Sequence, residues 1–307
     1  MERTVIIIEG PTCSGKTEVS LQLAKQIPSE IISADSRQVY KLLNIGTAKP
    51  NPEELSKAKH HLINSFNPDE DFNASKFEIE SLKIIEEIFS KGKIPIVCGG
   101  SGLYIKALVD GIFNSVDTDE ELRNHFLEMK KNKGDEYLYE ELKKVDPESA
   151  SKMLPQNWKR VMRALEVFTL AGMPIWKLQE NYKRDTGLNF MQFGLLWNRE
   201  LLYKRIEERV DMMFNSGLIN EVQNILSLGY SKELNALNTV GYKEVIAYLE
   251  NEITLERAIE LVKRNTRRFA KRQMTWFRKD ERINWFEINS EEGLNTISEK
   301  IIQKLYR

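Results

Sequence analysis

The chain has 307 residues and carries 45 Lys and Arg residues against 46 Asp and Glu residues, a formal net charge of −1 at pH 7. Apolar residues make up 41% and charged residues 30%, which is typical of a soluble globular enzyme and excludes an extensively disordered chain. No apolar run approaches the roughly 18 residues that a membrane span needs. Two cysteines cannot form a disulfide framework, so we expect a reducing, cytoplasmic location.

The first hundred residues alternate short β-branched runs with helical patterns. Strands are predicted at residues 4–8, 30–33 and 94–98, and helices at 16–27 and 74–91. Strand and helix repeated in this way indicate a parallel sheet covered by helices. The predicted fold class is therefore α/β, a P-loop parallel sheet flanked by helices.

The pattern changes near residue 111, where strand signals almost disappear. A strand at 192–196 is predicted to return the chain to the sheet. We therefore expect a discontinuous P-loop core at residues 1–112 and 191–307, interrupted by a helical insertion domain at 113–190. The helices expected in the insertion lie at 119–131, 136–144 and 158–170, and those after it at 199–215, 218–228, 242–250 and 254–278.

A glycine-rich loop lies between the first predicted strand and the first predicted helix. It matches the pattern G-x-x-x-x-G-K-[ST], whose backbone N–H groups wrap a phosphate at a helix N-terminus. Lys16 adds a positive charge, and the Thr17 hydroxyl can ligate Mg²⁺. The pattern predicts that the loop binds a diphosphate or triphosphate. Its residues are Gly10, Pro11, Thr12, Cys13, Ser14, Gly15, Lys16 and Thr17.

The loop alone does not identify the reaction. A kinase or NTPase should also carry an acidic residue at the end of a neighbouring strand. The third predicted strand ends in Gly99-Gly100 instead, and the nearby strand-end acid is Asp35. From the residues alone, Asp35 is a Mg²⁺ ligand, a general base or a turn residue.

Short motifs lie along nearly the whole chain. Besides the loop they are Asp35–Tyr40 (DSRQVY), Gly46–Pro50 (GTAKP), His60–Leu62 (HHL), Gly99–Tyr104 (GGSGLY), Arg163–Val167 (RALEV), Val240–Glu244 (VGYKE), Ala270–Gln273 (AKRQ) and Thr275–Arg278 (TWFR). Each motif is weak by itself apart from the phosphate loop, but their joint order and spacing are specific. Together they resemble the motifs of the bacterial tRNA dimethylallyltransferases, also called tRNA isopentenyltransferases.

The resemblance implies transfer of a dimethylallyl group from dimethylallyl diphosphate to N6 of the adenosine on the 3′ side of the tRNA anticodon. The loop would then hold the leaving diphosphate, with Lys16 and a Mg²⁺ ion on Thr17 neutralising its charge. Asp35 is the expected general base. Ser101 stands where the family more often has Thr, and its hydroxyl is expected near the reacting adenosine. A monomer is expected.

RNA recognition requires a basic surface beside the catalytic pocket. Between Lys152 and Arg184 there are seven basic and two acidic residues, and between Lys263 and Lys279 there are eight basic residues and no acidic one. Lys263, Arg267 and Lys271 share one helical face, where like charges repel unless an anion is bound. The alternative is a solvated helix face. The expected tRNA contacts are Asp35, Ser36, Arg37, Gln38, Ser101, Arg123, Lys159, Arg160, Arg163, Arg267, Lys271 and Arg272.

Several features have simpler interpretations. His60 and His61 are expected to make structural hydrogen bonds, because adjacent side chains rarely converge on one metal ion. Cys13, which replaces the family's commoner Ala, is expected to fill space, although a thiol at a helix N-terminus can be reactive. The rival functions are prenylation of free AMP or ATP, small-molecule phosphorylation, and RNA binding without catalysis.

Overall fold

The computed structural model describes residues 3–112, 118–180 and 184–306. The chain divides into two compact units, one formed by Met1–Val109 with Thr186–Arg307 and the other by Asp110–Asp185. A core interrupted by an insertion is thus observed. The insertion ends earlier than residue 190, because a strand of the core already begins at Asn189.

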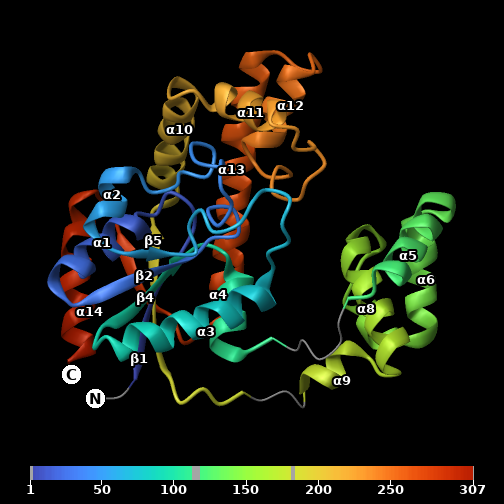
Figure 1. The fold of residues 1–307 in the computed structure, drawn as a ribbon, viewed down its shortest axis with the longest axis horizontal. Coiled ribbons are helices and arrows are strands. Elements are labelled where there is room, and N and C mark those ends of the chain that lie inside the picture. The colour runs from blue at the N-terminus through green and yellow to red at the C-terminus, as the bar shows by residue number, and fades with distance from the viewer. Residues whose placement is uncertain (1–2, 113–117, 181–183, 307) are drawn as a thin grey trace. The chain divides into compact units, whose positions relative to one another are not determined.

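A sheet of six strands, all pairing in parallel, forms the centre of the first unit, as the sequence predicts for an α/β fold (Figure 1). The strand order is β3-β2-β4-β1-β5-β6. Strands β3 and β6 were not predicted, since β3 has two residues and β6 is an edge strand with one buried side chain. The strands are β1 (Thr4–Glu9), β2 (Ser29–Ala34), β3 (His60–His61), β4 (Ile94–Gly99), β5 (Asn189–Trp197) and β6 (Asn284–Ile288).

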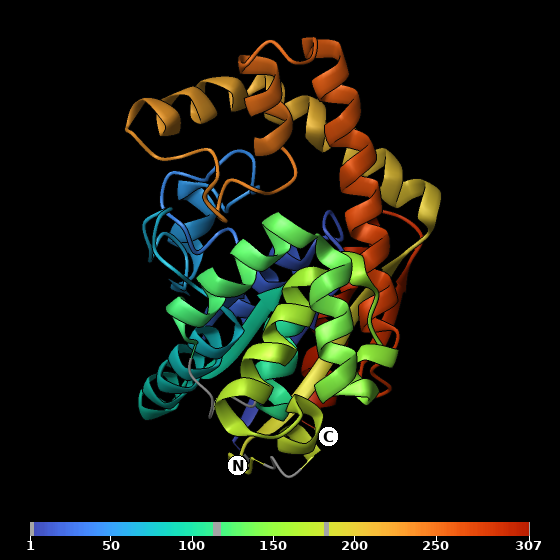
Figure 2. The same cartoon turned by 90° about the vertical axis from the view of Figure 1, so that its right-hand side faces the viewer.

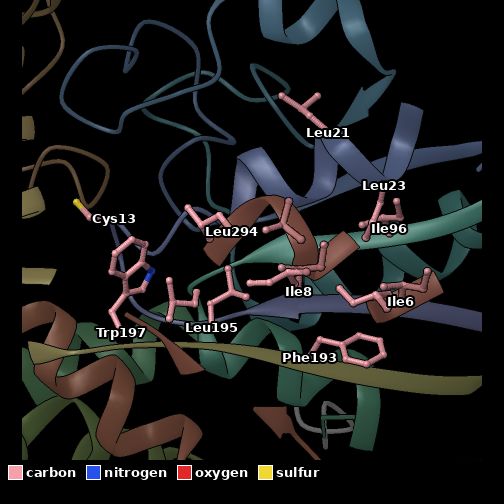
Figure 3. Packing of buried hydrophobic residues seen from close by; sticks show 14 of the residues in the cluster. Ile6, Ile8, Cys13, Leu21, Leu23, Ile96, Phe193, Leu195, Trp197 and Leu294 are labelled. Carbon is pink, nitrogen blue, oxygen red and sulfur yellow. The ribbon is translucent and has the colours of Figure 1, made fainter. Parts of the chain in front are cut away.

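One face of the sheet packs against helices α1 (Lys16–Gln26) and α14 (Ile297–Leu305). Alternate strand residues such as Ile6 and Ile8 point into this layer, because successive side chains of a strand leave on opposite faces. Figure 3 shows them meeting side chains from β5 and from the short 3₁₀ helix η2 (Glu292–Thr296). Burying each such aliphatic side chain contributes about 1.5–3 kcal/mol. This packing holds the start of α1, and with it the phosphate loop, against the sheet.

The other face carries α3 (Ala74–Ser90), which packs against β2 and β4, and α4 (Gly102–Asp110) follows β4 (Figure 1). The Phe77 and Tyr104 rings stack with centroids 4.8 Å apart. The Tyr104 hydroxyl donates a hydrogen bond to the Phe72 carbonyl at 3.2 Å, so its buried polar atom is satisfied.

Helices α10 (Arg199–Asn215) and α13 (Leu255–Phe277) lie side by side in both views (Figures 1 and 2). A short helix α2 (Pro52–Lys57) precedes β3, and α11 (Leu218–Ser227) and α12 (Tyr242–Leu249) connect α10 to α13. None of the helices within the described residues is long and apolar enough to cross a membrane.

The second unit is helical, as predicted. Its small core is formed by Phe126, Leu138, Leu142, Val161 and Leu165. The apolar residues of helix α8 (Trp158–Ala171) recur three and four positions apart, which places them on one buried face. Its elements are α5 (Glu120–Lys133), α6 (Asp135–Val145), α7 (Pro147–Ser151), the 3₁₀ turn η1 (Pro155–Asn157), α8 (Trp158–Ala171) and α9 (Ile175–Glu180).

Candidate active site

The glycine-rich loop turns between β1 and α1 through three residues with positive φ. Gly10 has φ 149°, Cys13 65° and Gly15 87°. A Cβ atom at Gly10 would lie 3.1 Å from the Leu195 carbonyl oxygen of β5, so the backbone passes close to the neighbouring strand. Glycine tolerates both the conformation and the contact. The loop therefore leads directly into the first turn of α1, where backbone N–H groups attract an anion.

Side chains from three other elements hold this loop in place. Trp197 donates its indole N–H to the Ser14 carbonyl at 2.9 Å, and Arg205 donates Nε to the Cys13 carbonyl at 3.0 Å. Gln273 of α13 accepts the Thr12 backbone N–H at 2.8 Å. The loop conformation is thus set by α10, α13 and β5 in addition to its own glycines.

Lys16 folds back onto the loop and donates to the Pro11 carbonyl at 2.6 Å. Burial lowers the pKa of Lys16, the positive charge of Arg209 lowers it further, and Cys98 and Asp35 oppose this shift. Arg209, from α10, lines a cavity that Lys16 also lines. The sequence reasoning missed this residue, because nothing near position 209 marks it as different from the other basic residues of α10.

Asp35 follows β2 and begins a turn. Its Oδ1 atom accepts the backbone N–H groups of Arg37 at 2.8 Å and Gln38 at 3.2 Å. Within the described part of the chain, Oδ2 makes no hydrogen bond. The turn interpretation is therefore correct for one carboxylate oxygen, and the other oxygen is available for chemistry.

Ser101 lies beyond the end of β4 and contacts the residues on either side of Asp35. Its Oγ accepts the Ser36 N–H at 3.0 Å, and its own N–H donates to the Ala34 carbonyl at 3.1 Å. A Cβ atom at Gly99 would lie 2.1 Å from the same carbonyl oxygen, so only glycine allows the two strand ends to come this close. Among the residues that the structure describes, the Ser101 hydroxyl donates no hydrogen bond, so it can donate to a ligand.

These residues share one cavity of about 530 Å³, within the usual size range of ligand pockets. The sequence-predicted residues that line it are Thr12, Cys13, Ser14, Gly15, Lys16, Thr17, Asp35, Ser36, Arg37, Gln38, Ser101 and Arg272.

Two of the predicted tRNA contacts in the insertion are ion-paired with an acid of the same unit. Arg123 and Arg163 both donate to the Glu166 carboxylate, at 2.8 and 2.6 Å, and Glu166 is fully buried. Burial alone would raise the pKa of Glu166, but the hydrogen bonds from the two arginines outweigh it and hold the pKa low. The two guanidinium groups thus neutralise a buried acid.

The basic face of α13 is also partly neutralised. Lys263 pairs with Asp211 at 2.6 Å and Arg267 pairs with Glu207 at 2.5 Å, both from α10. The argument that like charges on this face require a bound anion is therefore wrong for these two residues. Lys271 and Arg272, in contrast, are exposed, and Arg272 lies over the Phe269 ring at 5.7 Å.

In the insertion, Lys159 and Arg160 are exposed at the start of α8, where Lys159 lies over the Trp158 ring at 5.4 Å. Lys183, which contributes to the basic stretch of the insertion, lies outside the described residues. The exposed cations among the predicted tRNA contacts are thus Lys159, Arg160, Lys271 and Arg272.

The histidines make structural hydrogen bonds, as expected. His61 meets the buried carboxylate of Glu30 at 2.7 Å, and His60 meets the Ala58 carbonyl at 2.8 Å. No group of three or more His, Cys, Asp or Glu side chains suited to a metal ion is present in the described part of the chain. Cys13 is 3% exposed, which favours the space-filling role over a reactive thiol.

A parallel sheet flanked by helices, with a glycine-rich loop between β1 and α1, defines an α/β protein. Residues 38–280 match the sequence model of the IPP transferase family. The chain belongs to that family.

Two sequence relatives align with this chain over nearly their whole length. A tRNA dimethylallyltransferase of Acetivibrio thermocellus is 47% identical over 98% of this chain and 96% of its own, and one of Carboxydothermus hydrogenoformans is 46% identical over 98% and 97%. Among solved structures, the full-length tRNA isopentenylpyrophosphate transferase of Bacillus halodurans matches with a TM-score of 0.73 and 37% identity, over 100% of this chain and 97% of that one. A eukaryotic dimethylallyltransferase acting on tRNA matches with a TM-score of 0.80 and 28% identity, over 98% of this chain and 80% of that one.

Proposed function

We propose that the protein transfers a dimethylallyl group from dimethylallyl diphosphate to N6 of the adenosine on the 3′ side of the tRNA anticodon. The observation that carries the proposal is the shared cavity, in which a phosphate loop and a strand-end carboxylate face the same space in a member of the IPP transferase family. Relatives named tRNA dimethylallyltransferase support the choice of substrate.

The proposed reaction breaks the bond between C1 of the dimethylallyl group and the diphosphate oxygen and forms a bond between C1 and N6. Diphosphate departs with the electron pair of the broken bond. Lys16, Arg209 and the loop amides stabilise the negative charge that develops on it, which is the kind of electrostatic contribution that dominates many enzymes. Lys16 then exchanges its bond to the Pro11 carbonyl for one to a phosphate oxygen.

Adenine N6 is a weak nucleophile, because its lone pair is delocalised into the ring, and it must lose a proton as it attacks. Asp35 Oδ2 takes that proton, while Oδ1 stays fixed by the two backbone N–H groups. A positioned base of this kind contributes about 10²–10⁴ in rate. The Ser101 hydroxyl, held 3.0 Å from the Ser36 nitrogen, lies beside the same strand end.

The residues present fit a Mg²⁺ ion, because Thr17, whose hydroxyl is an oxygen ligand, lines the cavity at the end of the loop that would hold the diphosphate. Hard oxygen ligands of this type, together with diphosphate oxygens, are those that Mg²⁺ prefers. Thr17 would hold the ion, which when bound supplies further charge neutralisation for the diphosphate.

The tRNA substrate must present its adenosine out of the base stack, which is simplest in a single-stranded anticodon loop. Lys159, Arg160, Lys271 and Arg272 supply cations that are free to meet its phosphates. We also propose that the protein acts as a monomer in the cytoplasm.

The test is incubation with dimethylallyl diphosphate labelled in its prenyl group, Mg²⁺ and unmodified tRNA. Label should appear in the RNA, and nuclease digestion should place it on the adenosine next to the anticodon. Label in AMP but not in tRNA would indicate a nucleotide prenyltransferase instead. Phosphate transfer from ATP to a small molecule, without prenyl transfer, would indicate a kinase.

A further inference from the structure

Glu221 of α11 holds a loop that is far away in the sequence. Its carboxylate accepts three successive backbone N–H groups, from Asn44 at 3.0 Å, Ile45 at 2.7 Å and Gly46 at 3.1 Å. Successive amides that converge in this way form an anion-binding nest. Here the anion is a side chain of the same protein, so the turn at 44–46 is fixed by a charged group.

Tyr242, the first residue of α12, completes the arrangement. Its hydroxyl donates to Glu221 Oε1 at 2.6 Å, and its side chain is 0% exposed. A Cβ atom at Gly46 would lie 2.4 Å from the Tyr242 ring, so the ring packs directly on the glycine. Hydrogen bonds to charged acceptors contribute more than neutral ones. Glu221 and Tyr242 thus clamp the turn from two sides.

The turn held by Glu221 and Tyr242 also orients the side chain of Gln38. The Gln38 Nε2 group donates to the carbonyls of Thr47 and Ala48, each at 3.2 Å. Its Oε1 atom accepts the Ser33 hydroxyl at 3.3 Å. Because two carbonyls require two donors, the orientation of the amide is unambiguous and both of its hydrogens are used. The Gln38 side chain can therefore contact a bound base only as an acceptor, through Oε1.

The backbone of Gln38 connects this arrangement to the catalytic carboxylate, because its N–H donates to Asp35 Oδ1. We propose that Glu221 is a positioning residue: by holding the turn at 44–46 it fixes Gln38 and the segment 35–38, and so sets how the nucleic-acid substrate is presented to Asp35. The effect on tRNA rests on the proposed function, whereas the effect on the backbone does not.

The experiment compares Glu221→Gln, Glu221→Asp and the control Glu260→Gln, which removes an exposed carboxylate paired with Arg257 on α13. Glutamine places an N–H₂ group against the nest, whereas aspartate keeps the charge. Hydrogen exchange should accelerate in residues 35–48 of Glu221→Gln only. Loss of charge-assisted hydrogen bonds should lower kcat/KM for tRNA by about 10- to 100-fold, with partial rescue in Glu221→Asp and unchanged affinity for dimethylallyl diphosphate in all three.

Unchanged exchange at 35–48 in Glu221→Gln would overturn the proposal even if the protein had another substrate. Faster exchange with normal tRNA kinetics would also overturn it, because the order of the segment would then not matter. Failure of the unmodified protein to prenylate tRNA would refute the proposed function alone, and the exchange measurement would still decide the positioning role. If Glu221→Gln does not fold, Tyr242→Phe, which removes one of the four hydrogen bonds, is measured in the same way with a smaller effect expected.

Discussion

Gln273 of α13 accepts the backbone N–H of Thr12 at 2.8 Å while donating its amide to the Gly100 carbonyl at 2.9 Å. The one side chain therefore joins the phosphate loop to the strand end that carries Ser101. A Cβ atom at Gly100 would lie 2.4 Å from Gln273 Nε2, so the contact needs glycine at that position. The two halves of the proposed active site are held together by a residue 261 positions from the loop.

Replacing this residue should separate the two halves. We expect Gln273→Leu to leave the Thr12 N–H and the Gly100 carbonyl unpaired, and to lower the free energy of unfolding by about 1–3 kcal/mol. Transfer activity should fall as well. Denaturant unfolding and single-turnover kinetics measure the two effects. An exposed neighbour, Lys271→Leu, should not change the unfolding free energy, and a similar loss in that variant would remove the special role of Gln273.

The exposed cations of α13 should contribute to the salt dependence of the affinity for tRNA. Replacing Lys271 and Arg272 together by alanine should reduce the slope of log affinity against log salt concentration by about 1.5, since each lost phosphate contact removes somewhat less than one unit. The charge-neutral pair Glu207→Gln with Arg267→Gln is the matched control, because Arg267 is already paired. An equal decrease of the salt slope in the Glu207→Gln, Arg267→Gln variant would show that Arg267 also contacts RNA.

Binding of dimethylallyl diphosphate should weaken at alkaline pH. Burial lowers the pKa of Lys16, so its ammonium form is lost at a pH below that of an ordinary lysine, and the attraction for diphosphate is lost with it. Lys16→Arg keeps its charge throughout this range and should bind with a flatter pH profile. The affinity for dimethylallyl diphosphate is measured by calorimetry between pH 7 and pH 10 for the unmodified protein and Lys16→Arg. The same decrease of affinity with pH in both proteins would assign the pH dependence to another group.

Stability in acid should depend on Glu30. This carboxylate is 2% exposed and meets Lys93 at 2.9 Å and His61 at 2.7 Å, with Lys59 and Lys91 nearby. Burial raises its pKa, but the hydrogen bonds from Lys93 and His61 and the lysine charges outweigh this and bring it to about 2.

Because the folded pKa of Glu30 lies below the unfolded value, its contribution is complete above about pH 4.5 and is lost as the pH falls toward 2. Glu30→Gln should therefore cost about 2–4 kcal/mol at pH 7 and progressively less from pH 4.5 downward. Urea unfolding at several pH values measures the difference. A cost independent of pH would mean that shape, and not charge, makes Glu30 important.

The sequence predicted those parts of the site that depend on local pattern. The phosphate loop and Asp35 both lie at strand ends, where a short motif fixes the backbone, and the structure brings them into one cavity. Glu221 was not found in this way, and Gln273 was noted only as part of the AKRQ motif with no role assigned, because each acts on a segment more than 170 residues away. Arg209 was missed for a related reason, since its place in the cavity depends on how α10 packs.

Charge counting did not reveal which cations are already paired. It placed Arg163 and Arg267 in the basic stretches expected to contact RNA, and the family resemblance added Arg123, yet all three are paired with acids of their own unit. The partner of Arg123 lies 43 residues away and that of Arg267 lies 60 residues away. Local spacing cannot reveal such pairs, because they form only when helices pack.

The most direct test of the account is single-turnover prenyl transfer to tRNA by Asp35→Asn and Thr17→Ala, each with Mg²⁺ titrated. Asparagine cannot accept the N6 proton, so we expect kcat to fall by about 10²–10⁴ with little change in KM for tRNA. Thr17→Ala should lose affinity for diphosphate and recover in part with excess Mg²⁺, whereas Asp35→Asn should not recover. If added Mg²⁺ restores Asp35→Asn as well as it restores Thr17→Ala, then Asp35 is a metal-site residue and the assignment of the general base is contradicted.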